Sequence, residues 1–502
     1  MKRVIVLLAS LKSANAGSKG AQTEKEAKVL YIFRYSGPAR EASGLKLNLS
    51  EEEFKEQVVS NEEIMNELRK RCPKVEFVGN TTPLGRDEIN RKFDNQSGDI
   101  DGIVLFGRNF TDKLSETNLP KIVVFPLWGM WQEGFTYPEQ KKKKMRVLTS
   151  HISVVRDKSD SVFASRFDDL AGKIKMIRAI AQMKDLKILS ITDYPPLGAY
   201  TSSYGDPEQY RKQWFDNLHD LGVELKTIPQ EELYDKVYQD ILNSEKDKAK
   251  AEQIAERWID QAKETAWKEI TKEDIIKSAA VYMAMKDLRD KYNCTNVTTE
   301  GYGQFAGYEK GPIPSQGMAS TQLFTESEFA APSECLIYSL LTQQLGFYAT
   351  GRKGHNGDYV IDPVNNVAQV MHCEGALNPY GGEERISFDL RELPQHYTNQ
   401  CGAIALIRYP TNKTVTVVGW SIHDKQIGVF TGESVPPENY FENLDYNWCR
   451  SKIFVKTDTE ALLENVNWKA FHQHRVAFYG DLREEFRNLA TLMGYDFIEV
   501  DK

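Results

Sequence analysis

The chain has 502 residues, of which 41% are hydrophobic and 27% are charged, and this length predicts several domains rather than a single core. Its 64 Lys and Arg residues against 72 Asp and Glu residues leave a net charge of −8, so no surplus of positive charge is available for a nucleic-acid backbone. The mean hydropathy is −0.51, and no apolar run approaches the ~20 residues of a membrane-spanning helix. We therefore expect neither a nucleic-acid nor a membrane partner.

The first residues leave two interpretations open. Residues 1–3 are Met-Lys-Arg, residues 4–11 are largely apolar, and residues 14–16 are Ala-Asn-Ala, which is the layout of a secretory signal. The alternative is a first strand followed by a polar loop. We expect a cytoplasmic protein, with a periplasmic or secreted one as the alternative if residues 1–16 are a signal peptide.

A regular alternation of strands and helices begins at residue 28. It comprises one charged helix over 50–71 and apolar strands over 29–33, 75–78, 103–107, 121–125 and 152–155. Such alternation predicts a parallel sheet. We expect this first α/β domain to cover residues 28–172, after an N-terminal extension over residues 1–27.

The alternation resumes with a strand over 187–191, a Pro-rich turn over 195–198 and a helix over 209–221. Residues 231–291 are rich in Lys, Glu and Ala and predict a solvent-facing helical surface. Beyond about residue 385 the pattern changes to β signals, such as 403–407 and 415–420, which indicate a β-rich C-terminal part. The six cysteines are scattered without CxxC pairs, so we expect mostly reduced thiols.

Six of the eight histidines follow residue 350, so a site is expected there. Ser333 has the character of a helix N-cap, which predicts a helix that carries Glu334 in its first turn and stops at Gly346. On its own, Glu334 is explained by the helix dipole. Asp358 follows 24 residues later in a segment that also favours a turn, and His372 stands at an expected strand end.

Together these residues form a pattern that resembles the L-fucose isomerase and L-arabinose isomerase superfamily. Glu334, Thr350-Gly351 and Asp358 match the fucose-isomerase register, and the segment 474–480, His-Arg-Val-Ala-Phe-Tyr-Gly, matches its C-terminal motif. His372 stands where the arabinose branch places a further metal ligand. The sequence departs from the fucose branch at Cys335-Leu336 after the glutamate and at Gln473 before the last histidine.

The resemblance implies an α/β chain with two Rossmann-like (doubly wound) domains and a C-terminal antiparallel β-barrel-like domain, which we place at 28–172, 173–345 and 346–502. It implies an aldose-ketose isomerase that acts on an open-chain monosaccharide and needs Mn²⁺ or Mg²⁺. Glu334, Asp358 and His474 would bind the metal, and the two carboxylates would also form the acid/base pair, a donor set suited to hard divalent cations. His372 would be a further ligand or a substrate contact. The family also implies a homo-oligomer, a trimer or hexamer.

Other residues are weaker candidates for contact with a sugar. Trp128 and Trp131 resemble the Trp-Gly turn that the fucose branch lends to a neighbouring subunit, although a structural aromatic turn better explains at least one of them. Trp420, Trp448 and Glu300 complete the set. Two other classes of function stay open: a two-lobed sugar-binding receptor, and a homologue that keeps the fold without catalysis.

Overall fold

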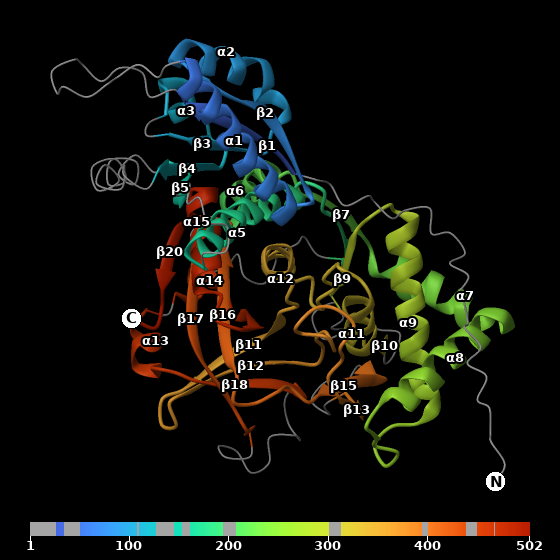
Figure 1. Ribbon diagram of the computed structural model, residues 1–502. Helices are drawn as coiled ribbons and strands as arrows, with labels where there is room; N and C mark the ends of the chain where they lie inside the picture. The colour runs from blue at the N-terminus through green and yellow to red at the C-terminus, as the bar shows by residue number, and fades with distance from the viewer. Residues whose placement is uncertain are drawn as a thin grey trace, which may run out of the picture.

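The computed structural model describes residues 27–34, 51–107, 110–126, 145–152, 161–193, 207–300, 313–393, 400–437, 449–465 and 467–502. Figure 1 shows an N-terminal sheet at one end, a barrel built mainly from the C-terminal third, and a helical region beside a second parallel sheet. Among the described residues, no helix is both long and apolar enough to cross a membrane.

The N-terminal sheet is parallel, with the strand order β2-β1-β3-β4-β5. The strands are β1 (Ala27–Arg34), β2 (Val75–Leu84), β3 (Gly102–Phe106), β4 (Lys121–Pro126) and β5 (Val147–Ile152). The helices are α1 (Glu51–Arg71), α2 (Arg86–Gln96), α3 (Asp112–Glu116) and α5 (Ser161–Met183), with a short 3₁₀ turn, η2 (Ser97–Asp99).

Side chains of β1 explain how this sheet is covered. Val29, Tyr31 and Phe33 join one apolar cluster with α1 and α5, whereas Leu30 and Ile32 join another with α2 and α3. Because successive strand residues point to opposite faces, both faces are apolar and both carry helices. The parallel sheet predicted from the alternation of strands and helices is confirmed.

The second parallel sheet has the order β7-β6-β9. Its strands and nearby helices are β6 (Lys187–Ile191), β7 (Glu224–Ile228), β9 (Asn296–Thr299), α6 (Pro207–Asp220), the π-helix η5 (Glu232–Val237), α7 (Tyr238–Asn243), α8 (Glu245–Gln261), α9 (Lys272–Lys291) and α11 (Gly317–Glu326). The predicted charged surface over 231–291 is helical except around β8 (Glu264–Thr265), and its apolar side is buried: Trp258 of α8 packs with α9 and donates from Nε1 to Gln322 at 3.1 Å.

Two small sheets adjoin this region. One joins β8 (Glu264–Thr265), β13 (Phe388–Glu392) and β15 (Ala403–Ile407), and the other joins β10 (Ile313–Pro314) and β14 (Gln400–Cys401).

The C-terminal part contains a closed, six-stranded antiparallel barrel in the order β16-β19-β11-β12-β18-β17, closed by the pairing of β16 with β17. The strands are β11 (His355–Asp362), β12 (Val367–His372), β16 (Thr414–Ser421), β17 (Gln426–Val435), β18 (Ser451–Lys456) and β19 (His474–Tyr479). The remaining elements are α12 (Ile337–Thr350), α13 (Thr459–Asn465), α14 (Trp468–Phe471), α15 (Arg483–Met493) and β20 (Asp496–Glu499).

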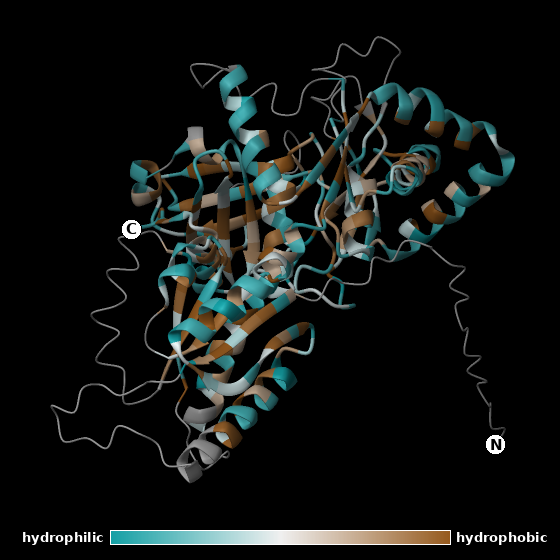
Figure 2. Ribbon diagram, turned by 90° about the horizontal axis from the view of Figure 1, so that it is seen from above, coloured by the Kyte–Doolittle hydropathy of each residue, from teal (hydrophilic) through white to brown (hydrophobic). Residues whose placement is uncertain are grey.

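Helix α12 is held closely against the barrel. A Cβ atom on Gly346 would lie 2.3 Å from the ring of Phe478 in β19, and one on Gly354 would lie 2.3 Å from Val476, so two glycines permit the close approach. One apolar cluster runs from β1 through α5 and α12 to the barrel, and Figure 2 shows the hydrophobic colour concentrated on the strands. The packing of α12 fixes the segment that precedes it relative to β19.

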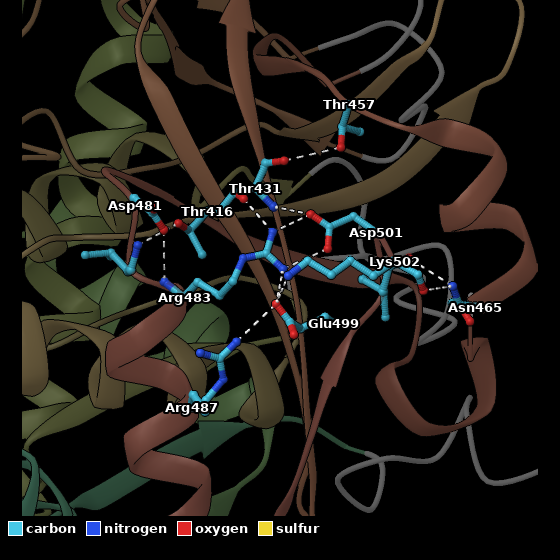
Figure 3. A network of polar contacts seen from close by, with 12 residues as sticks. Thr416, Thr431, Thr457, Asn465, Asp481, Arg483, Arg487, Glu499, Asp501 and Lys502 are labelled. Atoms are coloured by element: carbon cyan, nitrogen blue, oxygen red, sulfur yellow. Dashed lines mark hydrogen bonds and ion pairs between the residues drawn. The ribbon is translucent and has the colours of Figure 1, made fainter.

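Arg483 holds the last described residues against the barrel (Figure 3). Its Nη1 lies 2.9 Å from Glu499, its Nη2 pairs with Asp501, and Nη2 also donates to the hydroxyl of Thr431 in β17. Arg483 and Asp501 are largely buried, with side chains 14% and 10% exposed. The last residues are therefore part of the packed structure, because β20 also pairs in parallel with β17.

Candidate metal centre

Four side chains meet where α12 approaches one end of the barrel. Asp358 lies in β11, opposite His474, the first residue of β19, and His372 is the last residue of β12. These three strands are neighbours in the barrel, so their side chains gather at one end despite their separation in sequence. Glu334 precedes α12 and completes the group.

Glu334 contacts both histidines. Glu334 Oε1 lies 3.0 Å from His372 Nε2, and Glu334 Oε2 lies 3.6 Å from His474 Nε2. One ligand atom from each of the three residues lies within 4.8 Å of the other two, which makes them a group that could hold a metal ion. Asp358 Oδ1 lies 3.5 Å from His474 Nε2. The structure thus places His372 in the central group and Asp358 beside it.

The backbone at Glu334 differs from the sequence prediction. Helix α12 begins at Ile337 and continues to Thr350, so Glu334 is not in its first turn and Gly346 does not stop it. Glu334 and Cys335 instead have φ values of 62° and 51°, in the left-handed region that costs non-glycine residues about 1–3 kcal/mol each. Contacts with distant segments hold this conformation: the Cys335 N–H donates to Thr299 O at 3.1 Å, and the Ser333 N–H donates to Glu374 at 2.8 Å.

Asp358 also differs from its expected setting. The segment 355–358 is the start of strand β11 rather than a turn, because it pairs with β19 on one side and β12 on the other. The side-chain amide of Gln473 donates to Asp358 Oδ1. Gln473, the residue that departs from the fucose-isomerase motif, therefore orients a carboxylate of the site.

A second carboxylate, Glu374, supports His372 and was missed by the sequence analysis. Glu374 Oε1 lies 3.7 Å from His372 Nδ1, on the side of the ring opposite Glu334. Burial acts to lower the pKa of His372, but Glu374 and Glu334 outweigh it and raise this pKa well above 6.5. Burial raises the pKa of Glu374, and His372 offsets part of that rise. Without a metal, His372 is an imidazolium held between two carboxyl groups.

His474 has the opposite electrostatic character. Burial lowers its pKa, against the opposing effect of Glu334 and Asp358, so the imidazole is neutral at neutral pH. Its Nδ1 lies 3.4 Å from the hydroxyl of Tyr338 in α12, and a contact of this kind fixes which ring nitrogen carries the proton. Tyr338 is a second residue that the sequence analysis missed, since its role depends on packing between α12 and β19.

These residues fit a hard divalent cation. His474 Nε2 is buried and has no hydrogen-bond partner among the described residues, although it lies beside two carboxylate oxygens. The neutral imidazole of His474 and the neighbouring carboxylates form a nitrogen/oxygen donor set. Glu374 lies beside His372 Nδ1, in the position from which carboxylates orient ligating histidines at metal sites. The group of Glu334, His372 and His474 contains no thiol. All six cysteines are free, and burial raises the pKa of the neighbouring Cys335 to about 12, which makes its thiol unreactive.

The remaining predicted residues lie elsewhere. Trp420 is 2% exposed and belongs to the apolar core, 6.2 Å from the ring of Tyr495, so it presents no face to a sugar. Glu300 follows β9 and bonds to Thr192 and Gln230 rather than to the metal group. Trp128, Trp131 and Trp448 lie outside the described residues, as does the segment 1–26.

Comparison with models of known protein families gave no match to this chain, and comparison with curated proteins gave none either.

Proposed function

We propose that this protein is a metal-dependent aldose-ketose isomerase of the fucose/arabinose-isomerase type. The observation that carries the proposal is the group of Glu334, His372 and His474 at the end of the barrel, with Asp358 beside it. The sequence register that links Glu334, Asp358 and His474 gives additional support. In this proposal the two parallel sheets belong to two doubly wound domains, over 28–172 and 173–345.

The chemistry moves one proton from C2 to C1 of an open-chain aldose and one proton from O2 to O1. A bound Mn²⁺ or Mg²⁺ would act as a Lewis acid and stabilise the negative charge that develops on the sugar oxygens. Glu334 and Asp358 are the carboxylates at the centre, and we assign them the transfer: one removes the C2 proton as general base and the other serves as its acid partner. The Gln473 amide orients Asp358 for this role.

The test measures the metal content of the purified protein and its Mn²⁺-dependent interconversion of aldoses and ketoses over a panel of pentoses and deoxyhexoses. Glu334→Gln and Asp358→Asn each remove one carboxylate at nearly constant volume, and Glu464→Gln, on an exposed residue of α13, is the matched control. We expect turnover by the wild type and the control, and its loss in both site variants. A wild type that turns over no sugar would contradict the proposal.

A sugar-binding protein without catalysis is the second candidate, favoured by Cys335, which is partly buried where the fucose branch has a polar residue. Metal binding and sugar binding without turnover would support this candidate. The resemblance further proposes a homo-oligomer, a trimer or hexamer, which light scattering of the purified protein can measure. Mass spectrometry of the native N-terminus decides between a cytoplasmic and an exported protein.

A further inference from the structure

Two cysteines lie together at the ends of neighbouring barrel strands. Cys373 follows the last residue of β12, and Cys449 lies two residues before β18. Both side chains are buried, with the residues 5% and 2% exposed. They share one small apolar cluster, and among the apolar clusters of the described residues this one alone contains two thiols. The other members of this cluster are Met371, Leu393 and Ile404.

The pairing of the two strands explains why the thiols meet. β12 and β18 are antiparallel, with His372 opposite Ser451, and one step further along Cys373 corresponds to Arg450, the neighbour of Cys449. Cα atoms that face each other across an antiparallel pair are about 4.5–5.5 Å apart, within the range of roughly 4.4–6.8 Å that a disulfide bond spans. The side chains of Cys373 and Cys449 also share a hydrogen bond, which together with burial raises the pKa of Cys449 well above 9. The two sulfur atoms are therefore already in contact.

Other thiols of the chain have different surroundings. Three of them direct the sulfur atom to a backbone carbonyl oxygen: Cys72 to Ala171 at 3.8 Å, Cys294 to Tyr292 at 3.6 Å and Cys335 to Ile191 at 3.6 Å. A thiol of this kind is not placed to form a bond with a second thiol. Cys72 is as deeply buried as the pair, which makes it a suitable control.

Burial determines when a bond between Cys373 and Cys449 can form. Thiols enclosed in an apolar cluster react slowly with oxidants in the folded protein. In the unfolded chain the same thiols are exposed, and they meet when β18 pairs with β12. After the strands have packed, the enclosure that slows oxidation also keeps reductants away from a completed bond. The oxidation state is therefore set while the chain folds.

We propose that Cys373 and Cys449 form a disulfide bond when the chain folds in an oxidising compartment, that they stay two thiols when it folds in a reducing one, and that the folded protein retains either state. With glutathione disulfide as the oxidant, one cysteine thiolate attacks its S–S bond and releases one glutathione thiol. The other cysteine thiolate then attacks the mixed disulfide and releases the second. Two cysteine thiols are oxidised and one glutathione disulfide is reduced.

The bond would tie the strand end that carries His372 to the chain leading into β18. It closes a long loop, from residue 373 to residue 449, and a cross-link of this kind lowers the conformational entropy of the unfolded chain. The oxidised protein should therefore unfold at a higher temperature than the reduced protein. This inference does not depend on the proposed function, since it concerns the covalent state of the chain.

The test produces the full-length protein in two bacterial hosts, one with an oxidising and one with a reducing cytoplasm. Free thiols are alkylated under denaturing conditions, and the peptides are mapped by mass spectrometry. We expect a Cys373–Cys449 bond from the oxidising host, with the other four cysteines alkylated, and six alkylated cysteines from the reducing host. The oxidised form should have a midpoint of thermal unfolding several degrees higher, a difference that Cys449→Ala abolishes and the control Cys72→Ala retains.

Folded protein from the oxidising host with all six cysteines alkylated, or with a bond between other cysteines, would overturn the proposal. A second arm treats the folded, reduced protein with glutathione disulfide, alone and in a urea concentration that unfolds it. We expect the Cys373–Cys449 bond to form at least tenfold more slowly in the folded protein, because burial hides both thiols. Equal rates would contradict the claim that the folded protein retains the state in which it folded.

Discussion

The pH dependence of stability has a specific source in His355. This histidine is 2% exposed at the start of β11, where its Nδ1 lies 3.0 Å from the hydroxyl of Tyr409. Burial, with a smaller contribution from the charge of His372, lowers the pKa of His355 from 6.5 to about 3. The ring is therefore neutral in the folded state, whereas the unfolded chain binds a proton at its ordinary pKa.

The sign follows from which state takes up the proton first. Below pH 6.5 the unfolded state binds a proton that the folded state does not, so the free energy of unfolding falls as the pH falls, and this loss ends only near the lowered pKa. Each pH unit in this interval costs about 1.4 kcal/mol, so His355 alone removes about 3 kcal/mol between neutral pH and a pH of about 4.5. The raised pKa of His372 gives that residue the opposite dependence.

The assay compares the wild type with His355→Gln by urea unfolding at a series of pH values. The glutamine cannot take up a proton, so we expect the wild type to lose stability faster on acidification and the difference between the two proteins to change by about 3 kcal/mol. Comparison at each pH cancels the contributions of titrating groups that do not interact with His355. If the two stability curves stay parallel from pH 7 to acid, the argument from burial of His355 is refuted.

Two further predictions concern packing and the C-terminal contacts. Gly346→Ala should lower the free energy of unfolding by about 1–3 kcal/mol, because its Cβ would meet the Phe478 ring at 2.3 Å. Gly172→Ala in α5 should raise the free energy of unfolding by about 0.4–1 kcal/mol, because a Cβ there meets nothing within 4 Å. Thermal unfolding measures both variants, and equal effects would contradict the packing of α12 against β19. Arg483→Met should lower the free energy of unfolding by about 3 kcal/mol, because the largely buried Asp501 loses its ion-pair partner. The same variant should speed amide hydrogen exchange in β20. Unchanged exchange in β20 would show that the network of Figure 3 does not hold the end of the chain.

The parallel sheets were predictable because their strands bury both faces. Residues 29–33 are all apolar, and residues 187–191 carry three apolar side chains in five positions. A strand covered on both faces can be recognised from such an apolar run alone. Within the barrel, local patterns predicted the later strands and the strand end at His372. The pattern of β11 is weaker because it contains polar residues such as His355, Asn356 and Asp358, which are stabilised by contacts with neighbouring strands and α12.

The geometry of the site depends on contacts that local sequence rules do not contain. Ser333 has the character of an N-cap, but its N–H is bound by Glu374, which lies 41 residues further along the chain. That contact and the bond from Cys335 to Thr299 give Glu334 its left-handed backbone. The candidate ligands were predicted from the resemblance to the isomerase superfamily, whereas Glu374 and Tyr338 became visible only through the fold.

The strand order of the barrel has a consequence for biosynthesis. Glu334, Asp358 and His372 are translated close together, but His474 arrives in β19, roughly 100 residues after His372. At about 5–20 residues per second, the ribosome needs roughly 5–20 s to supply it. During that interval β11 lacks its β19 neighbour and the barrel cannot close. If the centre holds a metal, as proposed, a nascent chain would offer it only part of its donors, and loading would follow the release of the last strands.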